Sequence, residues 1–250
     1  MKKMIIANWK MNGSFLSIKN LCYHLNSLKY NEEHLKIVLC VPYVYLDYIR
    51  NIIKKNIAIG AQNVSSYLDG PYTGEISVNM LKEFDCQYVI VGHSERRSLF
   101  HENNKDTLQK IKIATNKNLS PICCIGEDSQ INSFEKLREN LDKQLLFLLK
   151  NLSSEEIKKI IIAYEPSWII NKSKPASLEH IEKVHIYIRD SLKKIDESLA
   201  KNSYIVYGGG LGQNNCCDIL ASKQVNGILI GKSSLDKENF ASIIKKVDFS

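Results

Sequence analysis

The sequence predicts an α/β protein, and within that class a closed (β/α)8 barrel with eight parallel strands and outer helices. Short apolar, β-branched runs recur eight times along the chain, and most gaps between them space their apolar residues three and four apart, as amphipathic helices do. The runs are continuously apolar, which is typical of parallel strands buried on both faces. Eight strand-helix units in 250 residues fit a closed barrel better than an open doubly wound sheet.

The elements follow one another in strict alternation. The candidate strands span residues 4–7, 37–41, 57–61, 88–91, 121–125, 160–164, 204–207 and 227–230. The candidate helices span residues 15–28, 44–54, 105–116, 134–149, 178–199 and 237–247. No low-complexity linker or glycine- and proline-rich hinge interrupts this order, so we expect one domain covering residues 1–250.

Composition narrows the class of protein. Hydrophobic residues make up 44% and charged residues 24% of the chain, which is ordinary globular usage and excludes disordered, collagen-like and disulfide-framework proteins. The net charge of +7 is spread along the sequence and forms no aromatic-interleaved basic stripe. We therefore expect no nucleic-acid partner, although a positive chain favours encounter with a small anionic substrate.

Cysteine usage and the N-terminus indicate the compartment. The seven cysteines include two adjacent pairs and no C-x-x-C spacing, a pattern that fits a reducing environment better than a disulfide or zinc framework. The apolar run after Lys2 and Lys3 ends at once at Asn8 and is too short for a signal peptide. No run reaches membrane-spanning length. We expect a cytoplasmic protein with no membrane partner.

Ionisable and polar residues directly follow three of the candidate strands. Asn8 and Lys10 come after the first strand, His93 and Glu95 after the fourth, and Glu165 after the sixth. Taken alone, each has an ordinary explanation as a surface charge or a turn cap. In a (β/α)8 barrel, however, all strand C-termini meet at one mouth, where active sites are built. The sequence therefore predicts an acid-base site there.

Glycine-containing turns follow the last two candidate strands. Residues 208–210 are three glycines, and Gly231, Lys232 and Ser233 come after the eighth strand. Backbone amides in such turns can approach a phosphate closely, and this is the usual place for a phosphate site in such barrels. The predicted substrate is a small phosphorylated molecule.

Motifs along the whole chain make the sequence resemble the triosephosphate isomerases. They are N-W-K-M-N-G (8–13), Q-N (62–63), T-G-E (73–75), V-G-H-S-E-R-R (91–97), C-I-G-E (124–127), A-Y-E-P (163–166) and Y-G-G (207–209). The resemblance implies a TIM barrel isomerase of glycolysis and gluconeogenesis that interconverts dihydroxyacetone phosphate and D-glyceraldehyde 3-phosphate. It implies no metal and no cofactor.

The resemblance also implies a role for each catalytic residue. Glu165 would abstract the carbon-bound proton and His93 would move protons at the two substrate oxygens. Lys10 and Asn8 would stabilise the enediolate oxygen, and Glu95 would orient Lys10. Such chemistry needs a positioned base and preorganised donors, because a proton beside a carbonyl is only weakly acidic. Triosephosphate isomerases are themselves the type case of a neutral imidazole electrophile beside a helix N-terminus.

A homodimer is the expected assembly. By the resemblance, the loop containing Thr73 and Glu75 would dock beside the active site of a second copy, with Glu75 pairing Arg96 across the interface. Apolar residues such as Tyr67 and Tyr72 in the same long loop would be exposed in a monomer.

The lid, residues 166–176, departs from the family pattern. Its predicted functional residues are Pro166, Ser167, Trp168, Lys174, Pro175 and Ala176, with Asn171 at the tip as a phosphate ligand. The glycines usual at the tip are missing, and Pro175 should stiffen the second hinge because proline fixes φ.

The phosphate cradle departs too. Its predicted residues are Gly210, Gly231 and Lys232, but Gly210 stands where the family has serine and Lys232 where it has a second glycine. A lost charge-assisted hydrogen bond is worth roughly 1.5 to 3 kcal/mol, or about one to two decades of affinity. We predict that the Lys232 ammonium compensates with a point charge.

Other sites fit the sequence less well. Residues 226–233 resemble the phosphate-binding loop of nucleotide hydrolases, but the two glycines of the motif, 227 and 231, are one residue too close together. The residues between them have the apolar pattern of a strand. Residues 208–215 give an incomplete dinucleotide motif, and Glu182 with His185 give half of a di-iron motif. Two alternatives keep the barrel: an isomerase of a four-carbon ketose phosphate, or a weakly active or noncatalytic barrel.

Overall fold

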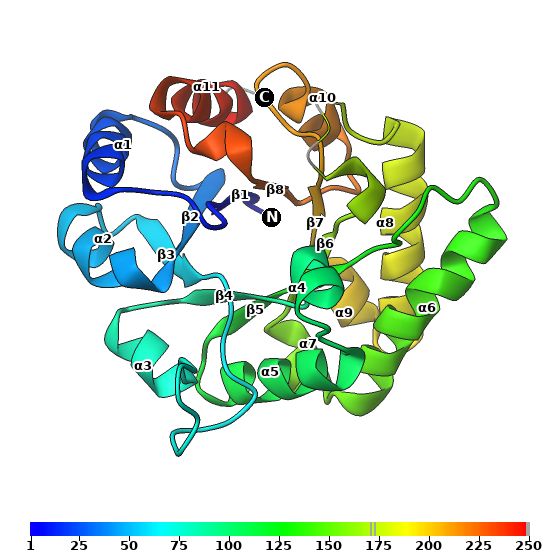
Figure 1. Cartoon of the computed structure of the whole chain (residues 1–250). Helices are drawn as coiled ribbons and strands as arrows, with labels where there is room; N and C mark the ends of the chain where they lie inside the picture. The colour runs from blue at the N-terminus through cyan, green and yellow to red at the C-terminus, as the bar shows by residue number, and fades with distance from the viewer. Residues whose placement is uncertain (171, 173, 249–250) are drawn as a thin grey trace.

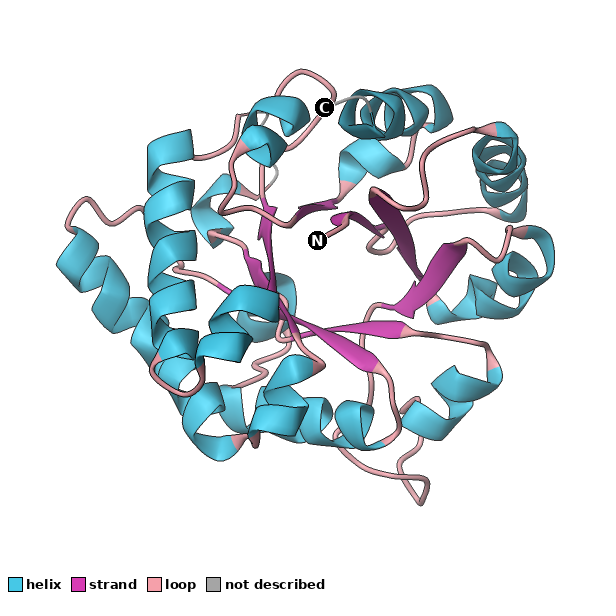
Figure 2. Cartoon of the chain, turned by 180° about the vertical axis from the view of Figure 1, so that it is seen from behind, coloured by secondary structure: helices cyan, strands magenta, loops and turns pink. Residues whose placement is uncertain are grey.

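A computed structural model describes residues 1–170, 172 and 174–248 and shows a closed barrel of eight parallel strands in chain order (Figures 1 and 2). The strands are β1 (Lys3–Asn8), β2 (Leu35–Val41), β3 (Ile57–Ala61), β4 (Tyr88–Val91), β5 (Ser120–Ile125), β6 (Ile161–Tyr164), β7 (Tyr204–Gly208) and β8 (Gly227–Ile230). Each pairs with the next, and β1 closes the ring by pairing with β8. The predicted fold class is confirmed.

Helices surround the barrel on all sides (Figure 2). The α-helices are α1 (Phe15–Ser27), α2 (Leu46–Ile52), α3 (Val78–Glu83), α4 (Ser94–Leu99), α5 (Asn104–Asn116), α6 (Phe134–Asn151), α7 (Ser154–Lys158), α8 (Leu178–Lys193), α9 (Glu197–Asn202), α10 (Cys216–Ala221) and α11 (Lys237–Asp248). Short 3-10 turns are η1 (Tyr43–Tyr45), η2 (Ser167–Ile169) and η3 (Lys232–Ser234). The N-terminal α1 and the C-terminal α11 pack side by side (Figure 1).

One predicted helix is wrong, and several short ones were not predicted. The expected helix 178–199 is two helices, α8 and α9, because the Asp196 side chain accepts from the backbone N–H of Ser198 and caps a new helix. The expected helix 44–54 begins as the 3-10 turn η1. Helices α3, α4, α7 and α10 have only five or six residues, which is too short to show a helical period.

Each strand is buried on both faces, as its continuous apolar pattern predicts. Alternate side chains fill the barrel interior with a small cluster that includes Ile6, Val38, Ile90, Ile122 and Leu229. The other side chains join a larger cluster between the strands and the helices. Because every strand runs in the same direction, all the carboxyl ends open at one mouth. Within the described ranges, none of the helices is long and apolar enough to cross a membrane.

His185 on α8 should make stability depend on pH. Its side chain is fully buried, its Nδ1 lies 3.2 Å from the carbonyl oxygen of Gln224, and burial lowers its pKa from 6.5 to about 4. The imidazole of His185 binds a proton more readily in the unfolded chain than in the folded one, so its titration does not oppose folding above pH 6.5. As the pH falls from 6.5 to about 4, this difference should lower the free energy of unfolding by about 3 kcal/mol in all.

A His185→Asn variant keeps an N–H that can reach Gln224 but cannot titrate. We expect its free energy of unfolding, measured by urea titration at fixed protein concentration, to fall less between pH 6.5 and 4 than that of the parent. His34→Asn changes an exposed histidine and serves as the control. Equal slopes for His185→Asn and the parent would contradict the prediction.

Candidate active site

A cavity of about 650 Å³ opens at the carboxyl ends of the strands. It is lined by residues from the loops after β1, β6, β7 and β8 and by the ends of two strands. The loop residues are Trp9, Lys10, Asn12, Glu165, Ile170, Lys172, Gly209, Gly210, Leu211, Gly212, Gly231, Lys232, Ser233 and Leu235, and the strand residues are Asn8 of β1 and Leu229 and Ile230 of β8. The structure therefore brings together the predicted base, the predicted cation and the predicted glycine turns.

Glu165 and His93 form a buried pair at this cavity. His93 Nε2 lies 3.2 Å from Glu165 Oε1, and the two residues are 3% and 6% exposed. Within the described part of the chain, His93 Nε2 and Glu165 Oε2 make no hydrogen bond. Buried polar atoms are normally satisfied, so two free ones facing the same site mark atoms that a ligand would engage.

The start of α4 fixes the orientation of His93. The residue is the N-cap of this helix, and its Nδ1 lies 3.2 Å from the backbone nitrogen of Glu95, which donates to it. A ring nitrogen accepts a hydrogen bond only when it carries no proton, so we assign the proton of the neutral ring to Nε2. The N–H of His93 then faces Glu165.

The pair also sets the protonation of its members. Burial raises the pKa of Glu165, but the facing His93 and then Lys10 outweigh it and hold that pKa below its ordinary value. Burial lowers the pKa of His93, and the Glu165 carboxylate overrides this and raises it. The amide that donates to Nδ1 works against that rise, because it requires an unprotonated nitrogen. Glu165 is therefore an ionised base at neutral pH.

Lys10 is held by both its backbone and its ammonium group. Its φ is +52°, a left-handed conformation that is costly for a residue other than glycine. Asn8 Oδ1 accepts from its backbone N–H at 3.0 Å, and Gln62 Nε2 donates to its carbonyl at 2.9 Å. Its Nζ lies 2.5 Å from Glu95 Oε1. The predicted set of Asn8, Lys10 and Glu95 is thus one cluster, to which Gln62 adds a holding contact that sequence reasoning missed.

Gly126 and Gly208 leave room for Glu165, a role that sequence reasoning also missed. A Cβ atom at Gly126 would lie 2.2 Å from the Glu165 carbonyl oxygen. One at Gly208 would lie 3.3 Å from Glu165 Cγ. The first value is a clash with backbone, so the base can stand where it does only beside a glycine. The C-I-G-E motif containing Gly126 was the available signal.

Comparisons with known proteins agree with this geometry. The family model described as triosephosphate isomerase matches residues 3–247. The chain belongs to the triosephosphate isomerase family. It is 43% identical over 248 residues to a triosephosphate isomerase from Francisella tularensis subsp. mediasiatica (strain FSC147), which covers 99% of this chain and 98% of that protein. A triosephosphate isomerase from Wigglesworthia glossinidia brevipalpis is 39% identical over 249 residues, covering 99% and 97%.

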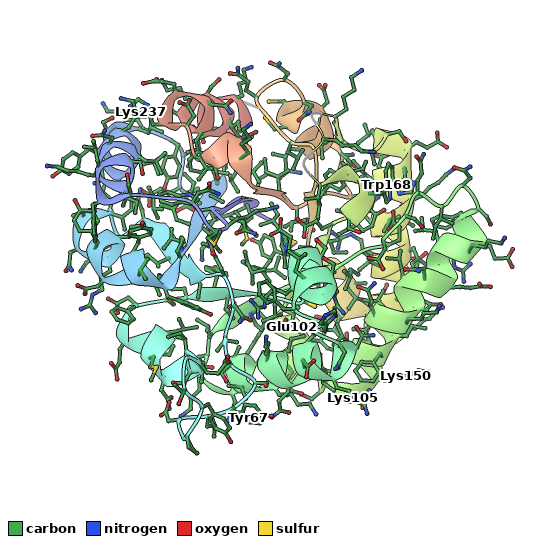
Figure 3. All side chains as sticks on the ribbon, in the orientation of Figure 1. Tyr67, Glu102, Lys105, Lys150, Trp168 and Lys237 are labelled. Carbon is green, nitrogen blue, oxygen red and sulfur yellow. The ribbon has the colours of Figure 1, made fainter. Side chains whose placement is uncertain are left out.

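Within the lid that is predicted from the triosephosphate isomerase pattern, described residues near both ends contact the barrel. After Pro166, the Ser167 backbone N–H donates to the carbonyl of Glu127 at 3.0 Å. Ile169 packs on the turn after β7, and at the far end the Ala176 N–H donates to the Tyr207 hydroxyl at 3.0 Å. Trp168 lies between the barrel and α8 (Figure 3).

The backbone of Lys174 and Pro175 leaves no room for a side chain at residue 210 of this chain. A Cβ atom there would lie 2.3 Å from the Lys174 carbonyl oxygen and 2.7 Å from the Pro175 nitrogen, and φ is +61°. A serine at 210 cannot coexist with Lys174 and Pro175 in these positions. The departures from the family pattern at the hinge and at position 210 are therefore linked, because the hinge backbone occupies the space of a side chain at 210.

The remaining phosphate-site residues are partly described. Gly231 and Lys232 line the cavity, and Lys232 is exposed. Across residues 1–170, 172 and 174–248, no hydrogen bond or ion pair of the Lys232 ammonium is found, so it is free to meet an anion. Asn171 lies outside the described residues.

The predicted interface residues lie on the surface of one chain. Thr73 and Glu75 are exposed in the loop after β3. Arg96 Nε already donates to Glu102, which also accepts from Lys110. Figure 3 labels Glu102 beside α4. The pairing of Glu75 with Arg96 across an interface stays a prediction, and Glu102 is a buried partner that sequence reasoning missed.

The rival motifs serve structural roles. Residues 227–230 form β8 and not a phosphate-binding loop. On α8, Glu182 accepts from Ser222 Oγ at 2.7 Å, and His185 bonds the backbone carbonyl of Gln224. Among the residues that the structure describes, no cluster of three or more His, Cys, Asp or Glu side chains is placed to hold a metal.

Proposed function

We propose that the chain interconverts dihydroxyacetone phosphate and D-glyceraldehyde 3-phosphate through an enediolate. The observation that carries this proposal is the buried Glu165–His93 pair, because Glu165 also lines the cavity that Lys10 and two glycine turns line. We place the reaction in glycolysis and gluconeogenesis in the cytoplasm.

In the proposed reaction, Glu165 takes the proton from the carbon beside the carbonyl. The electron pair of that C–H bond forms the enediolate double bond, and negative charge moves to the carbonyl oxygen. The His93 Nε2–H and the Lys10 ammonium stabilise this oxygen, and His93 moves a proton between the two oxygens. Glu165 then returns its proton to the neighbouring carbon, so that protons and electrons balance.

The two alternatives that keep the barrel are distinguished by a coupled assay. We expect turnover of D-glyceraldehyde 3-phosphate with a kcat/KM well above that for a four-carbon ketose phosphate. A preference for the four-carbon substrate would replace the proposal with the related isomerase. No turnover of either compound would favour a noncatalytic barrel.

Lys232 is the proposed point charge in the phosphate cradle. Lys232→Ala should raise KM about three- to tenfold and leave kcat nearly unchanged, because a screened, exposed charge contributes about 1 kcal/mol of uniform binding. Steady-state kinetics at low and high salt measures this, and the difference should shrink at high salt. Lys237→Ala, an exposed lysine outside the cavity, is the matched control. An unchanged KM would mean that Lys232 points into solvent.

We further propose that the chain is a homodimer built on the loop after β3. This loop projects from the barrel (Figures 1 and 2), and Tyr67 lies on it (Figure 3). Tyr67 and Tyr72 stack with ring centroids 4.3 Å apart, yet they are 53% and 41% exposed. Such a preformed apolar tip suits burial against a second copy. Sedimentation velocity at micromolar concentration should give twice the chain mass, and a single-chain mass would refute the dimer.

A further inference from the structure

Glu127, just after β5, has a buried carboxylate that is stabilised by hydrogen bonds from neighbouring side chains. Its side chain is fully buried, and it accepts from Trp168 Nε1 at 2.7 Å and from the Tyr164 hydroxyl at 3.1 Å and 3.2 Å. Burial raises the pKa of Glu127, and the hydrogen bonds from Trp168 and Tyr164 oppose that rise. A buried carboxylate that loses a donor is strongly penalised, so these bonds bind the start of the lid to the barrel.

His180, which follows the C-terminal end of the lid, contacts the Tyr164 hydroxyl that donates to Glu127. It lies in the first turn of α8, three residues after the N-cap Ser177, and its Nε2 is 2.7 Å from the Tyr164 hydroxyl. Its Nε2 is also 3.9 Å from Glu127 Oε1. Sequence reasoning did not single out His180, because nothing in its local pattern separates it from the exposed face of a helix.

Proton counting fixes the direction of this chain of hydrogen bonds. The Tyr164 hydroxyl has one proton, and it donates that proton to Glu127 only if His180 donates to the hydroxyl oxygen. Burial, and then the nearby Lys183, lower the pKa of His180, so its ring is neutral at neutral pH and carries one N–H. With that N–H on Nε2, the sequence of donors runs from His180 through Tyr164 to Glu127, where Trp168 joins it.

Both ends of the lid therefore meet at one carboxylate. Trp168 lies two residues after Pro166, and His180 lies four residues after Ala176. We propose that His180 is a positioning residue for the lid, which orients the Tyr164 hydroxyl toward Glu127 and so secures the Trp168 contact. The proposal rests on the proposed isomerase activity for its kinetic readout only.

Two substitutions at His180 separate this role from simple packing. His180→Leu keeps a branched side chain of comparable bulk and removes the donor, and it should lower kcat/KM about three- to tenfold, as expected for one lost hydrogen bond. His180→Gln keeps an N–H at a similar reach and should stay within about twofold of the parent. The urea midpoint of each variant, measured in parallel, shows whether it is folded under assay conditions.

The Trp168→Phe background tests the route of the effect. If His180 acts through Glu127 and Trp168, then His180→Leu should change kcat/KM by less than about twofold when Trp168 is already phenylalanine. Equal losses in both backgrounds would overturn the proposal and assign His180 to general packing. A loss in His180→Gln as large as that in His180→Leu would overturn it as well.

Fluorescence gives a readout that does not need catalysis. Trp9 and Trp168 are the two tryptophans, so the difference between a variant and its Trp168→Phe counterpart isolates Trp168 emission. We expect this emission to shift to longer wavelength in His180→Leu and to stay unchanged in His180→Gln. An inactive protein that shows this shift would refute the proposed function and support the His180 contact, whereas an active protein without the shift would refute the contact alone.

Discussion

Glu165→Gln should lower kcat about 10²- to 10⁴-fold while changing KM only slightly. Glutamine has nearly the same shape as glutamate but cannot accept a proton from carbon, and positioned general acid-base catalysis contributes about this factor. The glycine turns and Lys232 remain in place, so substrate binding should persist. Steady-state kinetics in both directions of the reaction measures the effect.

The same variant carries an internal control at His93. The Glu165 carboxylate raises the pKa of this imidazole against the lowering effect of burial. Its removal should therefore lower the pKa of His93, which an NMR titration of the ring can follow in parent and variant. A Glu165→Gln protein with the kcat of its parent would end the assignment of Glu165 as base. An unshifted His93 would mean that the two side chains do not face each other in solution.

The arrangement of the proposed catalytic residues was predictable because it depends on topology. Parallel strands place their carboxyl ends at one mouth, so Lys10, His93 and Glu165 had to converge once the barrel was recognised. The sequence also indicated a helix start at Ser94, directly after His93, and His93 is the N-cap of α4. The extent of α4 was less accessible, because a helix of only six residues leaves almost no periodic signal.

What the sequence could not give are contacts between segments far apart in the chain. The clash that reserves position 126 for glycine involves the carbonyl of Glu165, which directly follows the neighbouring strand β6. The clash at position 126 depends on packing distances of a few tenths of an ångström, which residue types alone do not specify. The break between α8 and α9 has a different origin, because it depends on a local cap, Asp196, inside a pattern that otherwise continues as helix.

Position 210 shows how the structure changes the meaning of a departure from the family. From the sequence, the missing serine and the added proline are two separate losses. In the structure, the backbone of Lys174 and Pro175 occupies the space that a side chain at 210 would need. The departures at the lid hinge and at position 210 are therefore sterically compatible with each other, and Lys232 adds a charge to the lining of the cavity that Gly210 also lines.

Gly126→Ala should damage the site without touching a catalytic side chain. The added methyl would lie 2.2 Å from the Glu165 carbonyl oxygen, whereas non-bonded atoms pack at roughly 3.5 Å, so one of the two backbones must move by about 1 Å. A misplacement of that size can cost about 10²-fold in rate. We expect kcat/KM to fall about 10²-fold and the free energy of unfolding to fall by about 1 to 3 kcal/mol.

Gly208→Ala is the graded control, because it approaches the same glutamate less closely. Its methyl would lie 3.3 Å from Glu165 Cγ, and a side chain can yield the few tenths of an ångström that this requires. Kinetics and urea unfolding of both variants should therefore rank Gly126→Ala as the more damaging, with Gly208→Ala losing less than about tenfold in kcat/KM. If Gly126→Ala kept the parent kcat/KM, the backbone would have relaxed without moving the base, and the position of Glu165 would not depend on the space at residue 126.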